Sequence, residues 1–142
     1  MGYAKKLLLA KILVTLCVLF YSIVPVFIDF GPNHVASSQW SPHARFHLSW
    51  SLITNLISLP VLLFVVWSRL HGTGRSVRLV AFLGLAYSAG FFIASNLRPA
   101  LGSAHHDPGH SHLLMGTDAN IVTNAGLCII LLLAVILSIK RR

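Results

Sequence analysis

The sequence contains almost no acidic residues. Glutamate does not occur, and the 142 residues include only three aspartates, Asp29, Asp107 and Asp118. Lys, Arg, Asp and Glu make up 10% of the chain, against about a quarter of an ordinary soluble domain. This shortage weighs against a water-soluble fold. It also means that any carboxylate base must be an aspartate, with Asp107 and Asp118 as the candidates.

Motifs of several common enzyme classes are also missing. Cys17 and Cys128 have no CxxC spacing, so we expect them to pack and not to form a redox pair. The stretch HGTGRS has two glycines but no P-loop pattern, and no nucleophile elbow, dinucleotide-binding fingerprint or HExxH is present. We predict no nucleic-acid partner, because membrane topology and attraction to anionic lipid account for the net charge of +8.

The sequence is rich in long apolar runs. Hydrophobic residues make up 56% of the chain, and four runs lie at about 7–28, 48–68, 77–97 and 119–139. Each run can cross a hydrocarbon layer of about 30 Å as a helix, which satisfies its own backbone groups in lipid. We predict an all-α integral membrane protein with one domain, residues 1–142, folded as a four-helix bundle. The first run is expected to be kept as a helix, since no signal-peptide cleavage site follows it.

Basic residues predict the orientation in the membrane. With both termini on one side, only Arg45 and Arg98 of the 11 Lys and Arg residues fall on the other side. Basic residues collect on the cytoplasmic side, so both termini are predicted to be cytoplasmic. Two outer loops, at about 29–47 and 98–118, then carry all three acids. They also carry every histidine except His71, namely His34, His43, His47, His105, His106, His110 and His112.

The stretch SSQWSPHARFHLSW, residues 37–50, places two histidines at a predicted helix start. Ser41 is a good N-cap, and Pro42 suits the first helical position. His43 and His47 then share one helical face, with the i, i+4 spacing of two-histidine metal sites. Helix capping and interhelical hydrogen bonding are the alternative roles for this pair. The same face continues with polar residues, which are Ser51, Thr54, Asn55 and Ser58.

The fourth run repeats this arrangement. Thr117 is predicted to cap its helix, with Asp118 in the first turn, where the helix dipole favours a carboxylate. A second polar stripe follows at steps of four residues and consists of Asn120, Asn124 and Cys128. Polar residues inside a span usually face other helices. We therefore expect the two polar stripes, with Asn55 on one and Asn124 on the other, to pack against each other.

The outer histidines are candidate metal ligands. Neutral imidazole is the commonest metal ligand in proteins, and sets of histidines with or without a carboxylate suit zinc, iron or copper. The stretch HHDPGHSH, residues 105–112, could fold several ligands around one ion at its Pro-Gly turn, or could be a solvated loop without a specific ligand. The predicted ligands are His34, His43, His47, His106, His110 and His112, although His34 could equally be a turn residue.

Three further residues near the histidines are candidates for substrate binding. Trp40 could wall a pocket, although tryptophans at span ends commonly anchor the membrane interface. Arg45 could pair with a lipid phosphate, a substrate anion or Asp29. Arg98 could hold an anion, or could simply extend from its helix end toward water.

The segment QWSPHARFHLSW resembles the W-x-P-H-x-R-F-H signature of a family of small four-span membrane proteins of bacteria and fungi. In that family a histidine commonly precedes the tryptophan, as His34 does here. The resemblance covers about a tenth of the chain, and the rest is similar in hydropathy only. It implies a single functional unit but names no reaction. The unit would consist of Trp40, Pro42, His43, Arg45 and His47.

Three classes of function remain open on the sequence. We favour an enzyme of the bacterial inner membrane whose outer site acts on a lipid-like substrate by metal or histidine acid–base chemistry. The predicted catalytic residues are His43, His47 and Asp118. The predicted substrate contacts are Trp40, Arg45, Asn55, Arg98 and Asn124. The alternatives are a metal-handling membrane protein and a structural subunit without catalysis; membrane lipid is the expected partner, and a homo-oligomer is left open.

Overall fold

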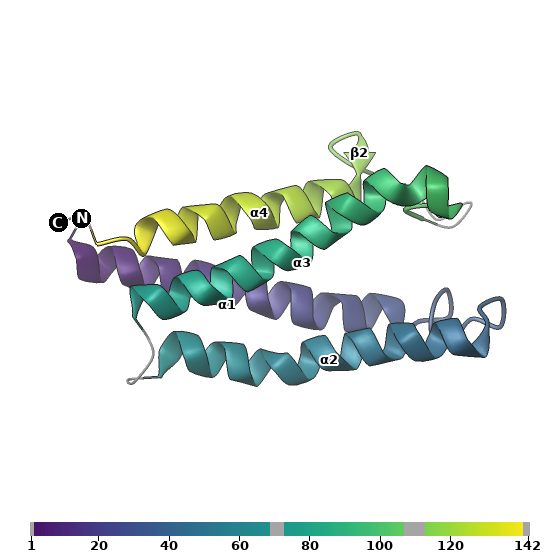
Figure 1. Ribbon diagram of the computed structural model, residues 1–142, viewed down its shortest axis with the longest axis horizontal. Coiled ribbons are helices and arrows are strands. Elements are labelled where there is room, and N and C mark those ends of the chain that lie inside the picture. Colours follow the sequence, from purple (N-terminus) through teal and green to yellow (C-terminus); the bar gives the residue numbers. More distant parts are fainter. Residues whose placement is uncertain (1, 69–72, 107–112, 141–142) are drawn as a thin grey trace.

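The computed structural model describes residues 2–68, 73–106 and 113–140 of the chain. Within these ranges four helices carry the fold (Figure 1), and they are α1 (Tyr3–Asp29), α2 (Pro42–Trp67), α3 (Gly74–Leu101) and α4 (Ala119–Leu137). All four are long and apolar enough to cross a membrane. The described residues therefore confirm the prediction of four long, apolar helices.

The start of α2 and the end of α3 both follow local chemistry. α2 begins as predicted, because the Ser41 hydroxyl accepts a hydrogen bond from the Ala44 amide at 3.2 Å. α3 was expected to end at about residue 97, but it continues through Pro99 and ends at Leu101, with Gly102 as its C-cap, whose φ of 60° suits glycine. Pro99 leaves the carbonyl four residues earlier without its helical donor. The Arg98 Nε donates to that carbonyl, on Ser95, at 3.0 Å.

The start of α4 differs from the prediction. Asp118 itself is the N-cap, because its Oδ1 accepts from the Asn120 amide at 2.8 Å, so the prediction of Thr117 as the cap is wrong. A short hairpin, β1 (Leu113–Leu114) and β2 (Thr117–Asp118), precedes the helix. Its turn residues Met115 and Gly116 both have positive φ, as a tight hairpin turn requires. Because Thr117 pairs with Leu114 in the hairpin, the N-cap is the next residue, Asp118.

The bundle is built around α1, which contacts each of the other three helices. α3 also contacts α2 and α4, whereas α2 and α4 do not touch each other in the described residues. In Figure 1, α2 and α3 lie close at one end and diverge toward the other. The expected packing of the Asn55 stripe against the Asn124 stripe is therefore wrong. The α2 hydroxyls bond to their own helix instead, at 3.0 Å for Ser51 and 2.8 Å for Ser58.

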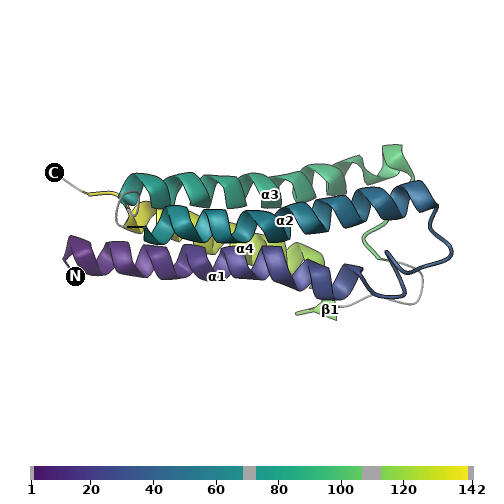
Figure 2. The ribbon, with the colours of Figure 1, turned by 90° about the horizontal axis from the view of Figure 1, so that it is seen from below.

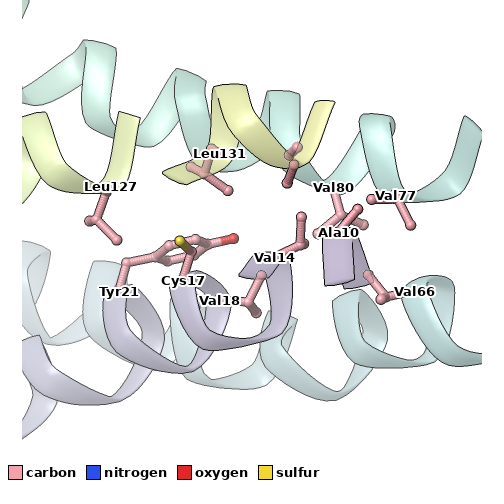
Figure 3. Close-up of a cluster of buried hydrophobic side chains, with 12 residues drawn as sticks. Ala10, Val14, Cys17, Val18, Tyr21, Val66, Val77, Val80, Leu127 and Leu131 are labelled. Atoms are coloured by element: carbon pink, nitrogen blue, oxygen red, sulfur yellow. The ribbon is translucent and has the colours of Figure 1, made fainter. Parts of the chain in front are cut away.

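The buried core lies in the half of the bundle nearer the chain termini. Figure 3 shows its side chains meeting between α1, α3 and α4. Cys17 is among them, and both cysteines are free, as the packing prediction requires. At this end the Ser138 carbonyl accepts from the Tyr3 hydroxyl at 3.4 Å and from Arg78 Nη1 at 3.1 Å. The fully buried apolar members of this core are Ala10, Val14, Val18, Val66, Val77, Val80, Ala81, Leu131 and Ala134.

The other end of the bundle holds the connecting segments. Figure 2 shows the segment between α1 and α2, and the segment that follows α3, lying away from the chain termini. The fully buried core does not extend to this end. The segment after α1 and the described residues that follow α3 therefore lie at the end of the bundle that the fully buried core does not reach.

Candidate functional site

A cavity of about 550 Å³ opens between α1, α3 and α4 near the loop end of the bundle. This volume is typical of pockets for small-molecule ligands. α2 contributes no residue to the cavity. The apolar part of its wall includes Phe20, Val24, Pro25, Ile28, Phe91 and Leu127. Its polar rim includes Asp29, His34, His105, His106, Asp118, Asn120 and Asn124.

Asp29 and His34 form the polar pair on the α1 side of the rim. The loop after α1 turns back, because the Val35 amide donates to the Asp29 carbonyl at 3.0 Å. This turn brings His34 Nδ1 to 3.6 Å from Asp29 Oδ1. The Trp40 ring stands edge-on to the imidazole, with the centroids 5.5 Å apart. His34 thus lies between a carboxyl group and an indole. Trp40 does not line the cavity, so its predicted role in substrate binding stays a prediction.

A second polar cluster lies on the α3–α4 side and is centred on Asp118. His106 Nδ1 lies 3.2 Å from Asp118 Oδ2, and His105 Nδ1 lies 3.8 Å from the same oxygen. His105 is further held by the Ser95 hydroxyl, at 2.9 Å from its Nε2, and by the Phe91 ring, stacked with centroids 5.5 Å apart. The His105 side chain is nearly buried, whereas that of His106 is 43% exposed. His106 is therefore the imidazole that faces the opening.

The hydrogen bonds assign which ring nitrogen carries the proton in each imidazole. The Ser95 hydroxyl donates its only proton to the Phe91 carbonyl at 2.8 Å, so it must accept from His105 Nε2. An ionised Asp118 can only accept, so His106 Nδ1 is its donor. The Nε2 of neutral His106 then carries a free lone pair. A neutral imidazole held in this way by a carboxylate is suited to act as a base.

The surroundings of Asp118 favour its ionised form. Burial opposes ionisation of the carboxyl group, but hydrogen bonds from the Asn120 amide and from His106, and the nearby His105, outweigh it and lower the pKa of Asp118. The lowered pKa keeps the carboxylate charged at neutral pH, as the assigned tautomer of His106 requires.

This pKa shift predicts how stability changes with pH. A lowered folded-state pKa contributes stability that is present above the unfolded value, about 3.9, and is lost as the pH falls through the folded value. We expect the melting temperature to fall below about pH 4, and to fall less in Asp118→Asn, which has no carboxyl group to titrate. Melting curves in detergent from about pH 6 to about pH 3 measure the difference. Parallel curves for the two proteins would contradict the assignment.

The asparagines of α4 complete the rim. Asn120 Nδ2 donates to the His105 carbonyl at 3.4 Å, and Asn124 Nδ2 donates to the Asn120 carbonyl at 3.0 Å. The Oδ1 of Asn124 is buried and has no hydrogen-bond partner among the described residues. Asn124 lines the cavity, and its role as a substrate contact stays a prediction.

The predicted residues of α2 lie apart from this cavity. His43 and His47 form an exposed pair on the helix surface, with their Nε2 atoms 3.0 Å apart. Arg45 and Asn55 lie on the same helix and do not line the cavity. Neither does Arg98, which bonds to the Ser95 carbonyl next to the site. The structure thus separates the predicted catalytic set, with Asp118 on the cavity and both α2 histidines outside it.

The six predicted metal ligands are also divided between different places. His34 and His106 line the cavity, His43 and His47 lie on α2, and His110 and His112 lie outside the described residues. In the part of the chain that the structure describes, no group of three or more His, Cys, Asp or Glu side chains is arranged to hold a metal ion.

Sequence reasoning did not assign a role in the site to Asp29, Ser95, Phe91 or His105. Asp29 is one of only three acids in the chain, and this rarity was the available signal. Ser95 and Phe91 lie in an apolar run without a distinguishing pattern. Their role depends on the placement of His105 against α3, which no local spacing predicts.

No protein-family model, curated protein or solved structure matches this chain. The resemblance of residues 39–50 to a four-span family therefore stays a prediction.

Proposed function

We propose that this chain is a multi-pass membrane protein of the bacterial inner membrane that binds a lipid-like molecule and performs acid–base chemistry on its head group. In this proposal both termini are cytoplasmic and the cavity opens on the outer side, as the distribution of Lys and Arg favours. Broad apolar exposure supports the membrane location, because water-soluble surfaces rarely expose such patches. Five large apolar side chains of α2 are each 59–66% exposed, and they are Phe46, Trp50, Ile57, Val61 and Phe64.

One observation carries the proposed activity. A cavity with an apolar inner wall has two histidine–aspartate pairs on its rim, contributed by separate loops. An amphiphilic molecule would place its hydrocarbon part against the wall and its polar part between the pairs. Convergent ionisable residues beside an apolar cavity are the usual mark of a ligand-binding or active site.

The residues of the rim would divide the chemistry between them. His106 Nε2 would take a proton from the reacting group or from water, and Asp118 would orient the ring and stabilise the imidazolium that forms. His105, fixed by Ser95 and Phe91, would support Asp118 and not react directly. The Asp29–His34 pair would lie on the opposite side of the head group and would donate a proton to the reacting group there.

Untargeted lipid analysis tests this proposal. Purified protein in nanodiscs made from a bacterial lipid extract is incubated and the lipids are compared by mass spectrometry. We expect at least one amphiphile to be converted by the wild type but not by His106→Gln, nor by Val24→Trp, which fills the cavity. Ser58→Ala on α2 is the matched control and should retain conversion, because its hydroxyl only bonds to its own helix. An unchanged lipid composition with the wild type would contradict the proposed activity.

Metal binding is a second candidate function, and it rests on the α2 pair. Two imidazole nitrogens bound to one ion at about 2.0–2.1 Å each can lie 3.0 Å apart, the separation of His43 and His47 Nε2. Two ligands on an exposed helix face leave coordination positions for water or for a lipid phosphate. This site would be independent of the cavity.

The second candidate makes its own prediction. Protein purified without a histidine tag and exposed to zinc or copper is expected to retain about one ion per chain, and His43→Ala/His47→Ala is expected to lose it. His105→Ala/His106→Ala is the matched control, because it removes two histidines but leaves the α2 pair intact. Metal content by mass spectrometry is the readout. Equal metal content in both double variants would exclude the α2 pair as the site.

A further inference from the structure

The mouth of the cavity collects negative charge in an otherwise basic protein. The chain has 11 Lys and Arg residues against three Asp, yet Asp29 and Asp118 both line the cavity. No Lys or Arg of the described residues lines it. The rim has carboxyl groups at two places, and its histidines are the only described residues on it that could carry positive charge. Such a rim attracts a cation and disfavours an anionic head group.

Two residues that line the cavity, His106 and Asp118, retain hydrogen-bond acceptors. His106 uses its Nδ1 proton on Asp118, so its Nε2 presents a lone pair. Asp118 accepts at both oxygens but retains further lone pairs. A ligand that brings hydrogen-bond donors can therefore pair with His106 Nε2 and with Asp118.

We infer that the head group bound in this cavity is a protonated amine carried on a hydrocarbon chain. The inference rests on the proposed function and names its substrate class. An ammonium group supplies positive charge and three N–H donors, which match the Asp29 and Asp118 carboxyl groups and the lone pair of His106 Nε2. The apolar wall formed by residues such as Phe20, Val24 and Leu127 accommodates the chain.

Other head groups fit this rim less well. A phosphate or carboxylate would face Asp29 and Asp118 without an arginine or lysine to pair with it. An alcohol has one donor and no charge, so it leaves most of the acceptors unmet. A trimethylammonium group has the charge but no N–H donor. The preference for a head group can therefore be tested with ligands that have the same hydrocarbon chain and differ only in the head group.

Native mass spectrometry of the full-length protein in a non-ionic detergent tests the inference with dodecylamine, dodecanol, dodecanoate and dodecyltrimethylammonium. We expect dodecylamine to bind about tenfold or more tighter than each of the other three, the effect of a charge-assisted hydrogen bond. Asp29→Asn and Asp118→Asn should each lower its affinity about tenfold while changing dodecanol binding little. Asparagine is also an N-cap residue, so Asp118→Asn retains the start of α4. Ser58→Ala should bind all four ligands as the wild type does.

The outcomes separate this inference from the proposed function. If dodecanol, dodecanoate or dodecyltrimethylammonium binds as tightly as dodecylamine, the amine assignment is wrong, while the cavity remains a site for amphiphiles. If Val24→Trp binds all four ligands as the wild type does, or the wild type binds none of them, the lipid-like ligand itself is contradicted. Preference for the amine that both aspartate variants weaken supports the assignment.

Discussion

Asp118→Asn is expected to lower the rate of substrate conversion by about 100-fold or more, the usual contribution of a positioned acid–base group, without unfolding the protein. The Asp118 carboxylate requires a proton on His106 Nδ1, which leaves Nε2 as the base. An asparagine amide in the same place can donate to Nδ1, which moves the ring proton to Nε2 and removes the lone pair. The substitution is nearly isosteric, so the loss comes from the tautomer and the charge.

A comparison of two substitutions separates this effect from structural damage. Asparagine caps helices as well as aspartate does, so Asp118→Asn should keep the hydrogen bond to the Asn120 amide and lose only the stability that the ionised carboxylate contributes at neutral pH. Asp118→Ala removes both the cap and the carboxylate, and should lower stability by about 1 kcal/mol in addition. Conversion rate and melting temperature are measured on the same preparations. Full activity in Asp118→Asn would remove the His106–Asp118 pair from the mechanism.

Gly74→Ala is expected to destabilise the bundle by about 1–3 kcal/mol, the usual cost of forcing extra volume into a packed site. Gly74 begins α3 where the two ends of the chain meet. A Cβ at this position would overlap the Ser138 carbonyl oxygen and would lie 2.8 Å from the Tyr3 hydroxyl. The carbonyl belongs to the backbone and cannot rotate away. The substitution would also disturb the hydrogen bonds that Tyr3 and Arg78 donate to this carbonyl.

Gly126→Ala is the matched control, and its effect should have the opposite sign. Gly126 lies inside α4, and a Cβ there would meet nothing within 4 Å. Alanine in a helix interior is favoured over glycine by about 0.5–1 kcal/mol, so this variant should be slightly more stable. Unfolding of both variants in mixed detergent micelles, followed by helical circular dichroism, gives the two free energies. Equal stability of Gly74→Ala and the wild type would show that the α3–α4 contact at Ser138 is not tightly packed.

The helices could be predicted because their signals are local. Each apolar run is a continuous stretch of sequence, and Ser41 with Pro42 marks a helix start that depends on neighbouring residues alone. The predicted helix ends were wrong where a contact that the local sequence does not indicate changed the end of the helix. Pro99 did not end α3, since the Arg98 side chain bonds to the carbonyl that the proline leaves free. Thr117 did not cap α4, since it pairs in the hairpin.

The candidate site could be predicted only in part. His34, His106, Asp118 and Asn124 were predicted as site residues, and all four line the cavity. The spacing of His43 and His47 correctly indicated that the two rings lie together, but spacing along one helix does not indicate which neighbour that helix faces. The helices nearest the cavity are α1, α3 and α4, and α2 does not reach it.

Four apolar helices joined by histidine-bearing segments follow from local sequence, because helix length, apolar character and caps depend on residues close together in the chain. Which histidines meet an aspartate does not follow from local sequence. That outcome depends on which helices are neighbours, and neighbours are selected by the fit of packed surfaces. Gly84 is an example, since an added Cβ there would lie 2.9 Å from Leu131. The close approach of α3 and α4 brings His105, His106 and Asp118 together, and the turn after α1 sets Asp29 and His34 across the cavity from them.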